Sequence, residues 1–75
     1  MNRFFGMMPS SEVEKEKTYK DSVGMNIKIQ AGPKGWTILY ADSSSEYRDV
    51  EASTEENFEE ALKTLKGNFS ELTEA

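Results

Sequence analysis

The feature that most constrains this chain is a hairpin pattern between residues 25 and 41. Residues 25–31 alternate strictly between apolar and polar side chains, which is the period of a half-buried β-strand. Residues 32–35, Gly-Pro-Lys-Gly, have the composition of a turn, and a second strand pattern follows over residues 36–41. The pattern predicts a folded domain that contains an antiparallel sheet.

The length of this loop decides which side chains enter the core. A four-residue loop over residues 32–35 places Ala31 opposite Trp36, Ile29 opposite Ile38 and Ile27 opposite Tyr40, with Met25 on the same face. A three-residue loop would instead turn Thr37, Leu39 and Ala41 inward, because a slip of one residue inverts the faces of a strand. We predict the first register, since it buries Trp36 and Ile38 with the isoleucines.

The segment before the hairpin allows two interpretations. Ser11 followed by Glu14 fits a capping box, so a helical turn could begin there. Read with a period of two, the same segment places Val13, Lys15, Lys17 and Tyr19 on one face, which is typical of an edge strand protected by lysines. We favour a strand over residues 14–20, and a turn over residues 21–24.

A second turn, rich in serine, covers residues 42–45 and leads into a further strand over residues 46–52. Pairing Asp42 with Glu46 around this turn places Val50 opposite Ile38 and Ala52 opposite Trp36. In this register the outer face of the sheet carries Leu39, Ala41 and Tyr47.

The clearest helix start in the chain is at Ser53. Ser53 and Glu56 form a predicted capping box, and Glu55 lies with Glu56 at the positive end of the helix dipole. An apolar stripe follows at spacings of three and four residues: Phe58, Ala61, Leu62, Leu65, Phe69 and Leu72. Gly67 places the helix end between residues 66 and 73.

These elements predict an α+β fold, an antiparallel β-meander of three to four strands with one C-terminal amphipathic helix packed on one face, in a two-layer sandwich. Residues 1–9 form an apolar N-terminal segment, and residues 10–75 form a single small domain. At 75 residues the chain is close to the lower size limit for independent folding.

Composition disfavours several functions. The chain has neither cysteine nor histidine, so it lacks the usual general base and the usual zinc ligands, and we expect no enzyme, no metal and no cofactor. Residues 1–42 carry six basic and five acidic side chains and residues 43–75 carry three and nine, for a net charge of −5. The acidic second half argues against nucleic-acid binding. No apolar run approaches the roughly 20 residues of a membrane span, so we expect a cytoplasmic protein that binds no membrane.

Two local motifs point to turns. Asp42, Ser44 and Glu46 place oxygens at alternate positions, as a calcium loop does, but the glycine and the distant glutamate of such a loop are missing. Residues 32–35 contain two glycines and a lysine, but they lack the spacing and the following helix of a phosphate loop.

The predicted order of a possible helical turn, three strands and a helix resembles the double-stranded-RNA-binding domain. That family carries lysines at the start of its last helix, where this chain has Ser-Thr-Glu-Glu-Asn at residues 53–57. The resemblance therefore extends to element order and not to RNA binding. The hairpin of residues 29–38 is also similar to small proteins common in bacterial genomes, a likeness that implies no activity.

The remaining hypothesis is a non-catalytic protein–protein interaction module. Its expected surface combines the apolar N-terminal segment with the outer face of the sheet: Phe4, Phe5, Met7, Met8, Leu39 and Tyr47. Self-association through this surface is the simplest form. The alternative is an acidic regulator or nucleic-acid mimic that binds a basic protein through residues 46–60, where Glu55, Glu56, Glu59 and Glu60 cluster.

Overall fold

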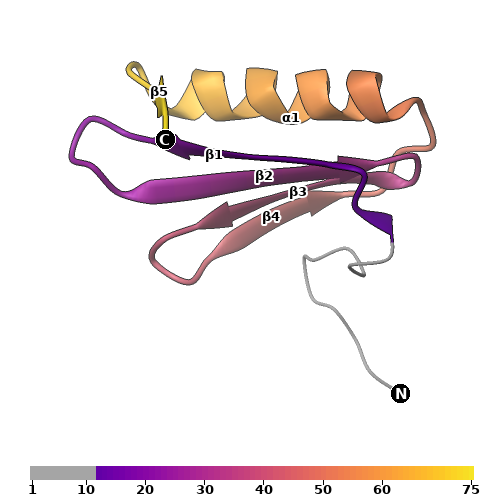
Figure 1. Cartoon of the computed structure of the whole chain (residues 1–75), viewed down its shortest axis with the longest axis horizontal. Coiled ribbons are helices and arrows are strands. Elements are labelled where there is room, and N and C mark those ends of the chain that lie inside the picture. The colour runs from indigo at the N-terminus through magenta and orange to yellow at the C-terminus, as the bar shows by residue number, and fades with distance from the viewer. Residues whose placement is uncertain (1–11) are drawn as a thin grey trace.

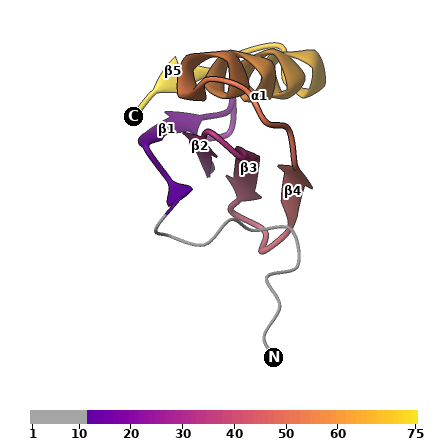
Figure 2. The same ribbon diagram turned by 90° about the vertical axis from the view of Figure 1, so that its right-hand side faces the viewer.

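The structure, a computed structural model, describes residues 12–75 as an antiparallel sheet with one helix across it. Along the chain the elements are β1 (Lys15–Lys20), β2 (Asn26–Gly32), β3 (Gly35–Tyr40), β4 (Ser45–Arg48), α1 (Thr54–Asn68) and β5 (Thr73–Glu74). The strands are arranged in the order β4-β3-β2-β1-β5. Figures 1 and 2 show α1 lying on one face of this sheet, so the predicted α+β two-layer fold is confirmed.

The hairpin of β2 and β3 has the predicted register. Ala31 pairs with Trp36, Ile29 with Ile38 and Ile27 with Tyr40. The ladder continues to a pair between Gly32 and Gly35, so the connection is tighter than predicted and consists of Pro33 and Lys34 alone. Gly35 has φ +142°, and a Cβ atom there would collide with the carbonyl of Arg48, so this position needs glycine.

The core lies between α1 and the face of the sheet that it covers. The buried apolar side chains come from β1, β2, β3 and α1: Tyr19, Ile27, Ile29, Ala31, Trp36, Ile38, Phe58, Ala61 and Leu65. The helix packs on β2 and β3, the strands that carry the three buried isoleucines and Trp36. Burial of each isoleucine, leucine and phenylalanine in this set contributes roughly 1.5–3 kcal/mol before the entropic cost is counted.

The start of α1 is also as predicted. Ser53 accepts a hydrogen bond from the N–H of Glu56 over 3.1 Å, and the Glu56 carboxylate accepts one from the N–H of Ser53 over 3.4 Å. The helix continues through Gly67 and ends at Asn68, within the predicted range. Phe69 and Leu72 lie beyond the helix, where both pack against the core and are partly buried.

The segment Lys15–Lys20 is a strand, and the alternative of a helix there is wrong. Its register with β2 places Lys15, Lys17 and Tyr19 on the covered face. β1 is not the outermost strand, however, because β5 pairs with Tyr19 and Lys20.

The prediction that Met25 belongs to the strand and its core face is wrong. Met25 precedes β2 and is 44% exposed. The turn explains this exposure: the carboxylate of Asp21 accepts hydrogen bonds from the N–H groups of Val23 and Met25, at 3.0 and 2.9 Å. These bonds hold Met25 in the turn and away from the helix.

The predicted register of the last hairpin is wrong by four residues. Glu46, and not Val50, lies opposite Ile38, and Arg48, and not Ala52, lies opposite Trp36. The turn closes early because Ser43 adopts φ +75° and the Asp42 carboxylate accepts hydrogen bonds from both the N–H and the hydroxyl of Ser44. Since four is an even number, Tyr47 keeps its predicted place on the outer face.

Residues 49–53 therefore leave the sheet and lead up to the helix. Asn57, which is 1% exposed, donates hydrogen bonds from its amide nitrogen to the carbonyls of Gly32 and Val50, at 2.7 and 2.9 Å. The N–H of Ala52 also donates to the carbonyl of Pro33. These bonds fasten the helix start to the β2–β3 turn.

Candidate functional site

The face of the sheet opposite α1, called the outer face below, is the first candidate for a functional surface. No helix or strand among residues 12–75 packs on this side (Figures 1 and 2). Because side chains alternate along a strand, the registers place the following residues on it: Glu16, Thr18, Lys28, Gln30, Thr37, Leu39 and Tyr47. The outer face is thus assembled from β1, β2, β3 and β4.

Two of the six predicted site residues lie together on this face. Leu39 is opposite Ser45 and Thr37 is opposite Tyr47, so Leu39 and Tyr47 are diagonal neighbours on adjacent strands. Leu39 is half-buried, whereas Tyr47 is 41% exposed. The other four residues, Phe4, Phe5, Met7 and Met8, lie outside the described part of the chain.

The two halves of the outer face differ in chemistry. Over β1 and β2, the carboxylate of Glu16 accepts a hydrogen bond from Gln30 at 2.7 Å and lies 3.8 Å from the ammonium group of Lys28. Over β3 and β4, Leu39 and Tyr47 provide apolar surface. Apolar surface beside polar groups is the usual composition of a protein–protein contact.

Tyr47 keeps its hydroxyl proton at neutral pH. Partial burial raises the pKa of Tyr47 above its ordinary value of 10.0, and the carboxylates of Asp49 and Glu12 add to the increase. The phenol is therefore a hydrogen-bond donor with an apolar ring, a combination that is favoured at interfaces.

A polar cluster at the other side of the sheet was not predicted. Glu60 of α1 accepts a hydrogen bond from the indole N–H of Trp36 at 3.0 Å, and its second oxygen lies 3.4 Å from the guanidinium of Arg48. The only sequence signals for this cluster are the single tryptophan and the arginine in β4. The contact depends on the β4 register, which differs from the predicted one.

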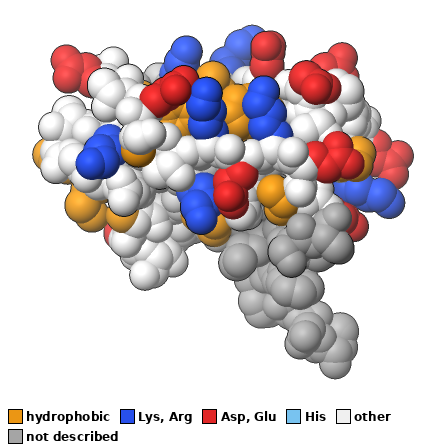
Figure 3. All heavy atoms as spheres, viewed as in Figure 1, with side chains coloured by type: hydrophobic (Ala, Val, Ile, Leu, Met, Phe, Trp, Pro, Cys, Tyr) orange, Lys and Arg blue, Asp and Glu red, His pale blue; other side chains and the backbone are white. Residues whose placement is uncertain are grey.

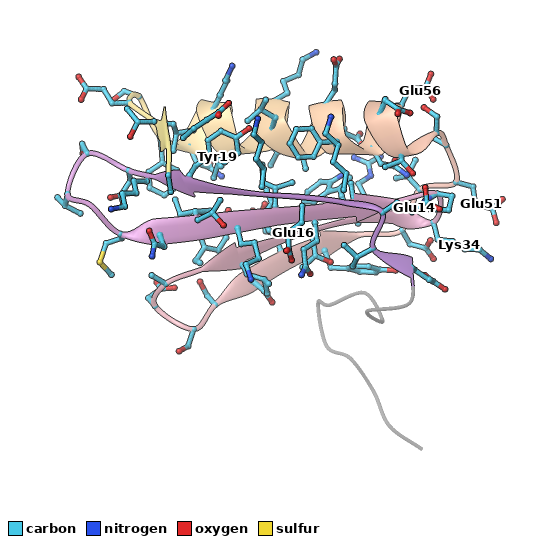
Figure 4. The ribbon with its side chains drawn as sticks, in the orientation of Figure 1. Glu14, Glu16, Tyr19, Lys34, Glu51 and Glu56 are labelled. Carbon is cyan, nitrogen blue, oxygen red and sulfur yellow. The ribbon has the colours of Figure 1, made fainter. Side chains whose placement is uncertain are left out.

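The acidic helix start is less continuous in space than in sequence. Glu60 is engaged with Trp36 and Arg48, and Glu56 is engaged in the cap. Glu55 and Glu59 are exposed. Figure 4 shows Glu56 at the same end of the molecule as Lys34 and Glu51, so this end carries both acidic and basic groups.

A shallow depression of about 460 Å³ lies on the side of the molecule between β1 and α1. Its floor includes Phe58 and Leu62, and its rim includes Lys15, whose ammonium group lies 4.4 Å from the centre of the Phe58 ring. Figure 3 shows hydrophobic side chains flanked by lysines on this side. Glu55 and Glu59 line the same depression and reduce its positive charge.

The Asp42–Ser44 pattern forms a turn in the structure, with its oxygens used in local hydrogen bonds. Within residues 12–75, no three histidine, cysteine, aspartate or glutamate side chains form a group that could hold a metal ion. In the same residues, no helix has the length and apolar character needed to cross a membrane.

Comparison with protein-family models, with curated proteins and with solved structures found no match to this chain.

Proposed function

We propose that this protein acts by binding another protein, without catalysis, through the outer face of its sheet. The observation that carries the proposal is the position of Leu39 and Tyr47. They are diagonal neighbours on the face opposite α1, where Tyr47 is exposed and its cross-strand partner Thr37 is fully buried. An exposed aromatic ring beside an aliphatic side chain is a common centre of a protein contact.

The polar half of the same face supports the proposal. Glu16, Lys28 and Gln30 are held by contacts with one another, so they present a pre-arranged set of donors and acceptors beside the apolar half. Preorganised polar groups lose less conformational entropy on binding than free ones. The proposed surface also includes four residues of the N-terminal segment because their side chains are apolar: Phe4, Phe5, Met7 and Met8.

The second hypothesis, an acidic regulator that binds a basic protein, has weaker support. Two of the four clustered glutamates have partners within the protein, and Lys34 lies at the same end of the molecule. Binding through residues 46–60 would decrease steeply with added salt, whereas contact through Leu39 and Tyr47 would not.

The first test is affinity capture with the full-length chain and two matched variants. Tyr47→Lys replaces the exposed aromatic ring by a charge, and Val23→Lys makes the same kind of change at a turn residue that is 78% exposed. We expect Tyr47→Lys to reduce capture of bound proteins by about tenfold or more and Val23→Lys to leave capture unchanged. Equal capture by both variants would show that the outer face is not the contact surface.

The contribution of the N-terminal segment needs a separate variant. Replacing Phe4 and Phe5 by serine in the full-length chain is expected to weaken capture without changing the urea midpoint of unfolding. A large decrease in the midpoint would show that these two rings belong to the core instead.

A further inference from the structure

The free edge of β4 has the features of a site for a second copy of this chain. β4 is the last strand of the sheet on its side, and none of the residues 12–75 pairs with its outer edge (Figure 2). α1 packs on β2 and β3. The edge of β4 therefore presents backbone groups that no described element covers.

The hydrogen-bond pattern shows which backbone groups face outward. At the turn the N–H of Tyr40 donates a hydrogen bond to the carbonyl of Ser44 over 2.9 Å, so the backbone of Ser44 faces β3 at this position. Because hydrogen-bonded and non-hydrogen-bonded pairs alternate in an antiparallel ladder, Glu46 and Arg48 direct their backbone groups to β3. The backbone groups of Ser45 and Tyr47 consequently face the free edge.

The side chains of β4 carry opposite charges two residues apart. Glu46 and Arg48 are both on the covered side of the sheet, since they lie opposite Ile38 and Trp36. One oxygen of Glu46 is buried without a hydrogen-bond partner. Arg48 has a 62% exposed side chain despite its contact with Glu60, so its guanidinium group can also donate hydrogen bonds to a second carboxylate.

We infer that β4 pairs antiparallel with β4 of a second copy, around a two-fold axis at Tyr47. In this register Tyr47 pairs with Tyr47 of the second copy through the outward backbone groups of both. Glu46 then lies directly opposite Arg48 of the second copy, and the symmetry repeats the contact. Opposite charges in this position stabilise a strand pair.

The charges also exclude the neighbouring registers. An axis at Glu46 would place the two copies of Glu46 directly opposite each other, and an axis at Arg48 would do the same with two guanidinium groups. Like charges directly opposite are destabilising. Among the axes at Glu46, Tyr47 and Arg48, the sequence Glu-Tyr-Arg in β4 favours the axis at Tyr47. This self-complementary charge pattern is why we infer a second copy as the occupant.

This inference rests on the proposed function only in taking the partner to be a protein. β4 has four residues, so the strand contact alone buries far less than the roughly 800 Å² per partner of a stable interface. The expected dimer is therefore weak, with a dissociation constant on the order of 0.1–1 mM. It should weaken further as salt is added.

The test uses two charge-reversal variants of the full-length chain, Glu46→Arg and Arg48→Glu. Each variant alone places like charges opposite one another at the axis. We therefore expect its association constant for dimerisation to decrease by roughly tenfold or more. Mixed in equal amounts, the two variants place opposite charges across both contacts. Sedimentation should therefore find monomers in each separate solution and dimers in the mixture. Circular dichroism of each variant checks that it is folded.

A second measurement identifies the edge itself. Titration of the labelled wild-type chain followed by NMR should shift the amide signals of Ser45 and Tyr47 with concentration and leave that of Lys66 in α1 unchanged. A wild-type chain that stays monomeric at about 1 mM, or variants that dimerise separately as well as they do mixed, would overturn the inference. If either variant is unfolded, the concentration dependence of the Ser45 and Tyr47 signals in the wild type decides the question.

The two proposals can fail separately. Arg48 is on the covered side of the sheet, so Arg48→Glu should prevent edge pairing and leave capture through the outer face intact. A loss of capture by Tyr47→Lys together with a monomeric wild type would support the proposed function and overturn the edge dimer.

Discussion

The two hairpins that share β3 differ in how their register is determined. In the β2–β3 hairpin, β2 alternates apolar and polar residues, and every side chain of the pairs Ile29–Ile38 and Ala31–Trp36 is buried under α1. In the β3–β4 hairpin, the partner strand is Ser-Glu-Tyr-Arg and has no apolar residue that reaches the core. Its register depends on the turn at Asp42 and Ser43.

The difference shows that burial and turn geometry can each determine a register. A slip in the β2–β3 hairpin would expose the isoleucines and is strongly opposed by the hydrophobic effect. A slip in the β3–β4 hairpin would break the hydrogen bonds of the turn and the contact between Arg48 and Glu60, but it would expose no core side chain of β4. Because β4 is polar, its register is weakly specified and it carries charged side chains at the edge of the sheet formed by residues 12–75.

The largest expected effect comes from removing core volume in the first hairpin. Ile29 is fully buried in β2, so Ile29→Ala should lower the free energy of unfolding by about 2–5 kcal/mol. Tyr47→Ala in β4 should lower it by less than about 1 kcal/mol, since Tyr47 is 41% exposed. Urea unfolding measures both values. Similar losses for the two variants would contradict the contrast between the hairpins.

The second largest effect on the free energy of unfolding is expected from the hydrogen bonds of Asn57 at the helix start. Asn57→Ala removes the donor that serves the carbonyls of Gly32 and Val50 and leaves a buried acceptor without a partner. We expect the free energy of unfolding to decrease by about 1–3 kcal/mol. Glu55→Ala, at an exposed helix position, is the control and should cost less than about 1 kcal/mol. An Asn57→Ala variant as stable as the control would show that these bonds do not stabilise the attachment of the helix start to the sheet.

The third prediction concerns the turn of the β3–β4 hairpin, where a substitution at Ser43 should stabilise the protein. Ser43 has φ +75°, a conformation that disfavours side chains with a Cβ atom. Ser43→Gly should therefore raise the free energy of unfolding by about 0.5–1 kcal/mol. Gly24, in another turn, has φ +87°. Gly24→Ser is therefore the reverse substitution and should lower the free energy of unfolding by a similar amount. A Ser43→Gly variant that is less stable than the wild type would show that the turn does not limit the register.

The smallest expected effect is a dependence of the same turn on pH. The hydroxyl of Ser44 and then its backbone N–H lower the pKa of Asp42 from the ordinary value of 3.8. A lowered folded-state pKa means that the stabilisation is present above about pH 3.8 and is lost as the pH falls through the folded-state pKa. The difference in urea midpoint between wild type and Asp42→Asn should therefore shrink as the solution is acidified. A constant difference would show that the charge of Asp42 does not stabilise the turn.

The predicted and observed positions of a few residues show which features local sequence patterns determine. The register of Ile29 with Ile38 followed from alternation, and the helix start followed from Ser53 and Glu56, because both depend on neighbours that are close in the chain. Leu39 and Tyr47 were placed on one face correctly even though the β4 register was wrong, since an error of four residues preserves the side of a strand. The positions of Met25 and Val50 were wrong because local turn bonds, and not hydrophobicity, decide them.

The sequence by itself therefore determined the β2–β3 hairpin, the helix with its cap and the covered face of the sheet. These features follow from periodicity and from capping chemistry, which act over a few residues. Only the tertiary structure decided that Asn57 joins the helix to two loops, that Glu60 meets Trp36 and Arg48, and that Glu46 and Arg48 lie at a free edge. These contacts join residues up to 25 positions apart, and their partners are set by the packing of α1 on the sheet, which no local pattern encodes.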